Sequence, residues 1–185
     1  MNPDKIITEF YQPGTRLYDI FMRHGEAVAK KAVTTAENLP HLSPDIEFIR
    51  QAAWLHDIGI FLTRAKNIGC HGDAPYICHG VRGRQLLDER GYPAHGLVCE
   101  RHVGTGIRKN DILSRNLPLP LRDMRPVSIE EKIICYADKF FSKKRGSRPK
   151  PIEAIITSLS SYGEDKVQTF LAWADQFDGI KKPQL

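Results

Sequence analysis

The stretch that decides the fold is Ala52-Ala53-Trp54-Leu55-His56-Asp57-Ile58-Gly59. It is apolar, it carries adjacent His and Asp residues, and it ends on glycine, which commonly terminates a helix. Neighbouring residues on a regular helix diverge by about 100°. His56 and Asp57 can therefore face one polar pocket only where the helix ends, and Gly59 supplies such an ending. Since a His-Asp pair is common by chance, other residues must support a site here.

Two further polar residues lie on apolar helical faces. His24 belongs to a predicted helix over 15–38, and Asp138 belongs to one over 128–142. Taken singly, His24 is more simply interpreted as a hydrogen-bonded core residue. Asp138 is more simply interpreted as a cap or as a partner in a salt bridge. An aspartate on such a face is nevertheless costly unless it is paired or binds a cation. With the central pair they form a mixed N/O set suited to Mn, Fe, Co, Ni, Mg or Zn: His24, His56, Asp57 and Asp138.

Helical periodicity dominates the chain, and strand-like alternation is nearly absent. Ser43-Pro44 is a helix start with Ser as N-cap, and Ser128 with Glu131 forms a capping-box pattern. The pattern predicts an all-α bundle of about seven to nine helices in a single domain, with loops over 60–74 and 143–150. The expected helices cover about 3–11, 15–38, 43–59, 75–90, 93–103, 128–142, 151–161 and 164–177, with one further helical turn near 109–115.

Composition bounds the class of protein. The 185 residues are 41% hydrophobic and 26% charged, which excludes a disordered or collagen-like chain. No apolar run approaches the roughly 20 residues that span a bilayer, and the N-terminus lacks the features of a signal peptide. We therefore expect a cytoplasmic protein with no membrane partner. The four cysteines have no zinc-site spacing and are expected to be reduced and mostly buried: Cys70, Cys78, Cys99 and Cys135.

The chain carries a net charge of +5, which favours anionic partners such as phosphorylated metabolites, nucleotides or nucleic acid. The densest positive run extends from Lys139 to Lys150 and includes Lys143, Lys144 and Arg145. A solvated loop is the simpler interpretation, and a rim that attracts a nucleotide or an RNA end is the functional alternative. Exposure in the loop is likewise the simpler interpretation of His71. We assign no role to His41 or His95, and we expect Trp54 and Trp173 in the core.

The order His24, His56-Asp57, Asp138 resembles the HD superfamily of metal-dependent phosphohydrolases, and the tetrapeptide 56–59 (HDIG) is typical of a large subset of it. The resemblance covers about 17–142. Stretches at 100–107, 130–133 and 136–139 look most like small stand-alone HDIG proteins of archaea and bacteria. The resemblance implies a metal held between helices of a single HD domain over 1–185. The core of that domain would cover about 17–142, with C-terminal helices over about 151–177 packed on it.

In HD proteins with two metals, two further histidines bind the second ion and the central aspartate bridges. Here the matching residues are His79 and His102, with Asp57 as the bridge. One or two divalent ions are therefore implied. With one ion, His79 and His102 would instead hold phosphate or act as acid, and a structural role for both is a third alternative. The implied ligands are His24, His56, Asp57, His79, His102 and Asp138.

The resemblance implies hydrolysis of a nucleotide-like phosphomonoester or phosphodiester by metal-activated water. Asp57, His79 and His102 are then the catalytic residues. Two alternatives remain open, namely a di-iron oxygenase of HD type and a nucleotide-sensing or RNA-binding module. The oligomeric state also stays open. Basic residues beside the motifs are candidates for binding the substrate phosphate: Arg82, Lys139, Arg23 and Arg101.

Overall fold

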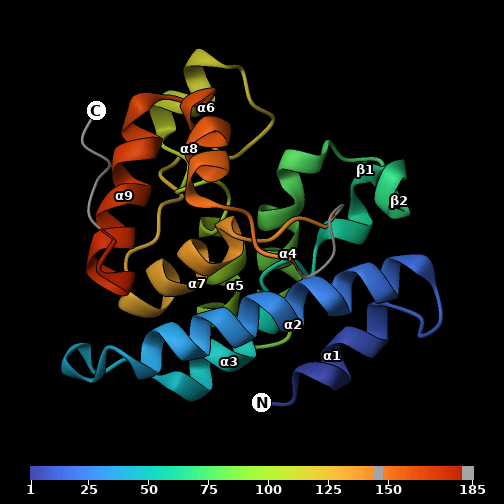
Figure 1. The fold of residues 1–185 in the computed structure, drawn as a ribbon. Coiled ribbons are helices and arrows are strands. Elements are labelled where there is room, and N and C mark those ends of the chain that lie inside the picture. The colour runs from blue at the N-terminus through green and yellow to red at the C-terminus, as the bar shows by residue number, and fades with distance from the viewer. Residues whose placement is uncertain (144–147, 181–185) are drawn as a thin grey trace.

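The computed structural model describes residues 1–143 and 148–180, and these residues form an all-α architecture as predicted (Figure 1). Within them lie nine α-helices and one antiparallel hairpin of two very short strands, β1 (Arg64–Ala65) and β2 (Cys70–His71). The hairpin belongs to the segment predicted as an irregular loop. The helices are α1 (Pro3–Phe10), α2 (Arg16–Glu37), α3 (Ile46–Leu55), α4 (His79–Asp88), α5 (Pro93–Arg101), α6 (Lys109–Ser114), α7 (Ile129–Lys139), α8 (Ile152–Ser160) and α9 (Glu164–Asp178).

Two helix starts differ from the sequence pattern. The predicted N-cap Ser43 is wrong, because Ser43 has φ 48° and ends a short 3-10 turn. Asp45 caps α3 instead, since its carboxylate accepts the N–H of Phe48 at 2.9 Å. At α7, Ser128 accepts the N–H of Glu131 at 3.2 Å, as predicted. The Glu131 carboxylate accepts the N–H of Val127, so the capping box is only half formed there.

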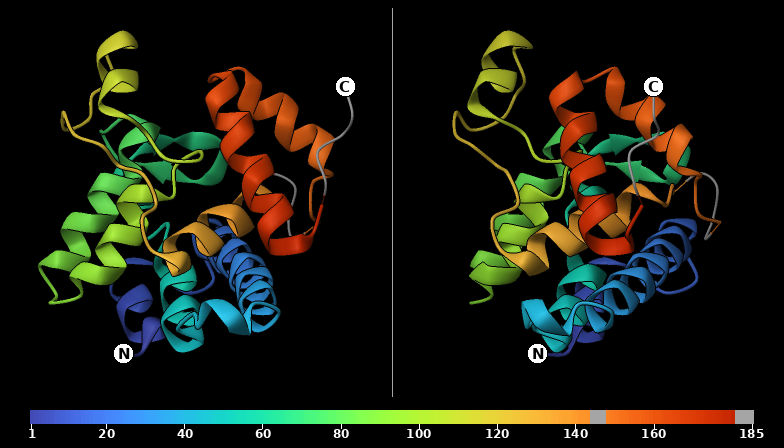
Figure 2. Two further views of the ribbon diagram at one scale, coloured as in Figure 1. Left: turned by 90° about the vertical axis from the view of Figure 1, so that its left-hand side faces the viewer. Right: turned by 60° about the vertical axis from the view of Figure 1, so that its left-hand side comes forward.

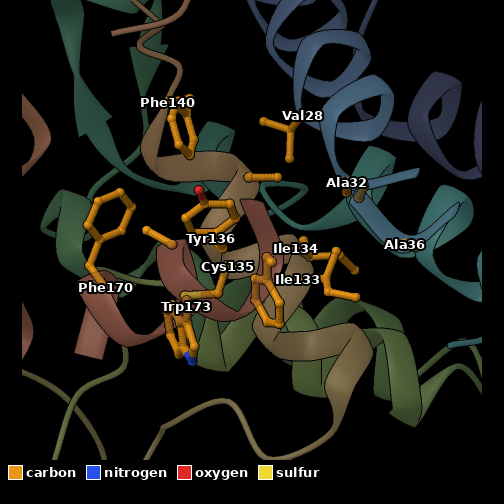
Figure 3. Packing of buried hydrophobic residues seen from close by; sticks show 14 of the residues in the cluster. Val28, Ala32, Ala36, Ile133, Ile134, Cys135, Tyr136, Phe140, Phe170 and Trp173 are labelled. Atoms are coloured by element: carbon orange, nitrogen blue, oxygen red, sulfur yellow. The ribbon is translucent and has the colours of Figure 1, made fainter. Parts of the chain in front are cut away.

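The main core surrounds α7, which lies between α2 and α9 (Figure 3). Small residues such as Ala32 on α2 let the large side chains of α7 approach closely. Tyr136 stacks on Phe170 of α9 with ring centroids 5.4 Å apart. Full burial of each large apolar side chain contributes about 1.5–3 kcal/mol. Trp173 is buried here as expected. This packing fixes α7, and with it the position of Asp138.

A second apolar cluster lies beneath the end of α3. Tyr11 follows α1, stacks on Phe21 of α2 with centroids 4.3 Å apart, and donates its hydroxyl to the carbonyl of Ile58 at 2.8 Å. Cys99 of α5 donates its thiol to the carbonyl of Leu55. These contacts bring side-chain donors to carbonyls at the end of α3 and in the turn that follows it. The turn that carries His56 and Asp57 is thus held from two sides.

Two glycines allow the close approach that the site requires. A Cβ on Gly25 of α2 would lie 2.9 Å from the Trp54 ring, and a Cβ on Gly59 would lie 2.3 Å from the carbonyl oxygen of His79. The first contact brings α2 against α3. The second brings the turn after α3 against the start of α4. Histidines that are distant in sequence therefore meet at one point.

The C-terminal helices α8 and α9 form a pair that packs on α7 and the loops before it (Figure 2). That these helices belong to a single domain over 1–185 stays a prediction. All four cysteines are buried and none forms a disulfide, which agrees with the expectation of reduced thiols. Among residues 1–143 and 148–180, no helix is long and apolar enough to cross a membrane.

Candidate metal centre

Three of the predicted ligands converge on one side of Asp57. His24 projects from α2, His56 follows the last residue of α3, and Asp138 lies in the last turn of α7. His24 Nε2 is 3.2 Å from His56 Nε2 and 3.0 Å from Asp138 Oδ1. Both imidazoles face the same oxygen of Asp57, since each Nε2 lies 3.1 Å from Oδ2. The end of α3 at Leu55 lets His56 and Asp57 share this pocket, as the sequence predicted.

The other two histidines face the second oxygen of Asp57. His79 begins α4, and His102 directly follows α5. Their Nε2 atoms are 3.1 Å apart and lie 3.4 and 3.5 Å from Asp57 Oδ1. The two oxygens of Asp57 therefore each face a different pair of imidazoles.

Backbone carbonyls orient three of the four imidazoles. The Nδ1 atoms of His56, His79 and His102 lie 2.6–2.8 Å from carbonyl oxygens three residues earlier in the chain. A carbonyl accepts only, so each Nδ1 carries the hydrogen and each Nε2 points a lone pair into the centre when the ring is neutral. Metal-binding histidines use such an outer hydrogen bond to fix their tautomer and ring orientation. His24 lacks this bond, because its buried Nδ1 has no partner among the described residues.

The donor atoms of the centre fit divalent cations. Imidazole Nε2 atoms and carboxylate oxygens face one another at 3.0–3.6 Å. Within the described part of the chain, no hydrogen bond of good geometry reaches either oxygen of the almost fully buried Asp57, and Lys143 contacts Oδ2 as an ion-pair partner. Burying carboxylate oxygens that lack hydrogen bonds is costly. A cation between these atoms removes that cost, and an N/O donor set is typical of first-row metals.

Two ammonium groups supply positive charge at the edge of the centre. Lys143 Nζ is 2.5 Å from Asp57 Oδ2, and Lys139 Nζ is 2.8 Å from Asp138 Oδ2. Lys139 also donates to the carbonyl of His102. The prediction that the basic loop is solvated is therefore wrong for Lys143, whose side chain is only 15% exposed. Lys144 and Arg145 lie outside the described residues.

The pKa values reflect this balance of burial and charge. Burial lowers the pKa of His79 to about 3, and it also lowers the pKa of His102. Burial acts in the same direction on His56, but Asp57 and Asp138 outweigh it and raise that pKa to about 9. Burial acts to raise the pKa of Asp57, but Lys143 and His56 hold it well below its usual value. Lys139 and His24 likewise outweigh burial at Asp138 and hold its pKa well below the usual value. Both carboxylates and the imidazoles of His79 and His102 are thus in the form that binds metal.

Of the four predicted phosphate-binding residues, only Lys139 is at the centre. Arg23 and Arg82 are exposed; Arg23 donates to the carbonyl of Asp19, and Arg82 lies 3.5 Å from Gln85. Arg82 follows His79 by three residues, but His79 turns inward at the helix start while Arg82 faces solvent. Arg101 pairs with the Glu131 carboxylate at 2.8 Å. The structure therefore does not bring Arg23, Arg82 or Arg101 to the ligands.

A cavity of about 550 Å³ leads to the centre, and both His24 and Asp138 line it. Arg64 of β1, Tyr76 and Lys143 also line this entrance cavity, and sequence reasoning had singled out neither Arg64 nor Tyr76. The ring of Tyr76 packs on His79 with centroids 4.8 Å apart. No spacing signal identified these residues, because the hairpin that positions Arg64 has no strand pattern. His71 of β2 is exposed, in line with its simpler interpretation.

A cavity of similar size, about 620 Å³, is lined by Arg101, Arg108 and Arg125. None of the six candidate ligands lines it. Two of these arginines are paired with aspartates, Arg108 with Asp165 and Arg125 with Asp123. Two of the candidate ligands, His24 and Asp138, therefore border the entrance cavity, and none borders this one.

Comparisons with known proteins find relatives that match part of their own length to this chain. The chain is 40% identical over 103 residues to an uncharacterized protein of Methanocaldococcus jannaschii. The matched segment covers 55% of this chain and 53% of that protein. It is also similar to proteins named tRNA (cytidine(56)-2'-O)-methyltransferase. The one from Picrophilus torridus is 33% identical over 128 residues, covering 69% of this chain and 33% of the relative. The one from Thermoplasma volcanium is 26% identical over 160 residues, covering 86% and 42%.

The chain thus spans between a third and about half of the length of these relatives. No solved structure matches it. The profile of the family described as HD domain matches residues 21–142, about two thirds of the chain. This range contains all six candidate ligands, and it contains α3, α4, α5 and α7 in full. The His and Asp side chains gathered there can hold a divalent metal, and the chain belongs to the HD domain family.

Proposed function

We propose that the chain is a metal-dependent phosphohydrolase that cleaves a nucleotide-like phosphate ester at a two-metal centre. One observation carries the proposal. The two oxygens of a single buried carboxylate, Asp57, face two separate imidazole pairs at 3.1–3.5 Å. This arrangement is the one that a carboxylate bridging two cations requires.

The residues divide into two sets of ligands. His24, His56 and Asp138 would hold one cation with Oδ2 of Asp57, and His79 and His102 would hold the other with Oδ1. Two divalent cations about 3.5–4 Å apart would supply Lewis acidity and an activated water for in-line attack on phosphorus. Their identity is left to experiment, because metal choice depends on supply as well as on ligand type.

The remaining groups of the centre suit a phosphate. Lys143 already holds an ammonium beside Asp57, and Arg64 lines the same entrance cavity. These cations can neutralise and orient the non-bridging oxygens of a bound phosphate ester. Lys139 has a different task, because it does not line the entrance cavity and its ammonium pairs with Asp138 and donates to the carbonyl of His102. It holds the Asp138 carboxylate in place and ionised.

A nucleotide-like ester is supported by two features outside the centre. The net charge of +5 favours anionic partners. Two relatives of this chain bear the name of tRNA methyltransferases and are longer than the matched segment. A segment of this kind within enzymes named for acting on RNA favours a nucleotide over a simple sugar phosphate as substrate.

The test starts from the purified full chain. The protein is stripped with EDTA, reloaded with Mn²⁺ or Fe²⁺, and assayed for phosphate release from nucleoside mono-, di- and cyclic phosphates. We expect Mn²⁺-dependent release. Asp57→Asn should lose both bound metal and activity, whereas the matched control Asp73→Asn, at an exposed aspartate, should keep both.

Two results would overturn the proposal. Full metal content in Asp57→Asn would show that the cations bind elsewhere. Oxygen consumption by the iron-loaded protein, with no phosphate release under any condition, would replace hydrolysis with the di-iron oxygenase that the sequence left open.

A further inference from the structure

A third cavity, of about 260 Å³, lies beside the metal centre. It is smaller than the range of roughly 300–1,000 Å³ that is usual for drug-sized ligands, so it suits one part of a ligand. Its lining is mostly apolar and comes from the loop after α5, from residues in or next to α4, α6 and α7, and from the C-terminal helices. The apolar lining includes Ile77, Val103, Ile107, Leu117, Leu159 and Tyr162.

This apolar cavity and the entrance cavity are neighbours. Asp138, Phe141 and Lys150 line both of them. Asp138 is a candidate metal ligand, so the apolar cavity begins where the centre ends. A ligand whose phosphate lies at the centre can therefore extend past Phe141 into the apolar cavity. The site has a basic part over the ligands and an apolar part beside them.

A buried hydroxyl at the wall of the apolar cavity lacks a partner. It belongs to Thr105, which is 4% exposed and lines both this cavity and the one of about 620 Å³, and no described residue hydrogen-bonds to this oxygen. The other buried polar group there, the Lys166 ammonium, is already engaged by the carbonyl of Gly106 at 3.1 Å and by Asp111 at 2.5 Å. A buried hydroxyl without a partner is costly. A ligand atom that exchanges a hydrogen bond with Thr105 would remove that cost.

The wall of the apolar cavity belongs partly to this chain's own C-terminal segment. The family match ends at residue 142. Ser158 and Leu159 of α8, Tyr162, and Lys166 of α9 all follow it and line the cavity. A part of the site built outside the region that defines the family is suited to select among substrates.

We propose that the apolar cavity binds the base of a nucleoside phosphate, with one hydrogen bond to Thr105, while the phosphate lies at the metal centre. This inference rests on the proposed function for the position of the phosphate. The base is a ring-sized group with polar edges, which matches a small, mostly apolar cavity with the unpaired, buried hydroxyl of Thr105 at its wall. The sugar would pass between the two cavities, beside Asp138 and Phe141.

The experiment compares substrates that differ only in the base. Ribose 5-phosphate and the four common ribonucleoside 5′-monophosphates are assayed with the Mn²⁺-loaded full chain. We expect kcat/KM for at least one nucleotide to exceed that for ribose 5-phosphate at least tenfold. Ser158→Phe places a ring at the exposed rim of the cavity and should lower kcat/KM for that nucleotide to the value for ribose 5-phosphate. Ser160→Phe, on the same helix but outside the cavity, is the matched control and should leave the ratio unchanged.

A binding measurement separates this inference from the proposed function. Calorimetry of the EDTA-stripped protein with the four nucleosides needs neither metal nor turnover. Binding of at least one nucleoside that Ser158→Phe abolishes and Ser160→Phe preserves would support the base site even if no phosphate is released. Thr105→Val should weaken that binding severalfold, and Thr105→Ser should retain it. Hydrolysis with equal kcat/KM for all five substrates, or nucleoside binding that Ser158→Phe leaves intact, would overturn the inference.

Discussion

Gly59 is the residue at which a single methyl group tests how the centre is assembled. A Cβ at this position would lie 2.3 Å from the carbonyl oxygen of His79 and 2.4 Å from the backbone nitrogen of Gly83. Both distances are about 1 Å or more inside the optimal separation of non-bonded atoms, roughly 3.5–4.0 Å. The obstacles are backbone atoms of α4, so no side-chain rotation can relieve the overlap. In Gly59→Ala, α4 must therefore move away from the turn that carries Asp57.

The magnitude follows from that displacement. Overpacking a well-packed interior costs about 1–3 kcal/mol, and we expect Gly59→Ala to reach the upper end, about 3 kcal/mol of unfolding free energy. His79 opens α4 and moves with it, whereas metal–ligand distances tolerate only about 0.2 Å. The pair formed by His79 and His102 should then lose its cation, while the other ligands keep theirs.

The assay is urea unfolding followed by far-ultraviolet circular dichroism, together with metal content by elemental analysis. Gly83→Ala is the matched control, because its Cβ would meet Cys99 at 3.2–3.3 Å and the backbone nitrogen of Gly59 at 3.3 Å, which are much milder contacts. There the gain in helix propensity, about 1 kcal/mol, offsets the crowding, and stability should change by less than about 1 kcal/mol. A Gly59→Ala protein with unchanged stability and two bound metals would refute the idea that this close approach positions His79.

Three further predictions concern groups around the centre and away from it. Lys143→Ala should lower kcat/KM for phosphate release at least tenfold while both metals stay bound. The control Lys132→Ala, in the cavity that no candidate ligand lines, should change neither kcat/KM nor metal content. A Lys143→Ala enzyme with the full rate would contradict the proposed contact with phosphate. Glu100→Gln should cost about 2–3 kcal/mol of stability in urea unfolding, because the buried carboxylate accepts from Arg84 and Arg122 at 2.5 Å each; a loss below about 0.5 kcal/mol would show that this pairing contributes little. Burial lowers the pKa of His95 to about 4, so on acidification the unfolded chain binds a proton at this histidine before the folded chain does. The contribution of His95 to the free energy of unfolding is fully present above pH 6.5 and should fall by up to about 3 kcal/mol as pH drops to 4. His95→Phe should remove this part of the pH dependence, and identical profiles of stability against pH for the two proteins would contradict it.

Much of the helical framework was accessible from sequence because periodic apolar faces report burial directly. The segment that contains α2 and the one that contains α7 were placed to within a few residues, and His24 and Asp138 stood out as polar residues on apolar faces. Gly59 also indicated correctly that the helix ends close to His56 and Asp57, although α3 ends at Leu55, four residues before Gly59. These inferences succeeded because each depends on one helix and its own pattern.

The features that sequence reasoning missed depend on contacts between elements. Lys143 belongs to a basic run that is typical of a solvated loop, yet its ammonium reaches Asp57 because the chain after α7 folds back over the centre. Arg82 was expected beside His79 on one helical face, but His79 is the first residue of α4 and its ring turns inward. Asp45 replaced Ser43 as the cap of α3 because the residues before it form a 3-10 turn. Helical periodicity carries no information about how loops pack on helices.

The most direct test of the account is the number of metal ions per chain. Elemental analysis of the wild-type protein, reloaded with Mn²⁺ after EDTA treatment, should give two ions. The double variant His79→Ala/His102→Ala should give one, because His24, His56, Asp57 and Asp138 still hold a cation through Oδ2 of Asp57. One ion per chain in the wild type, unchanged by the double substitution, would contradict a bridging role for Asp57 and would leave His79 and His102 free to contact the substrate.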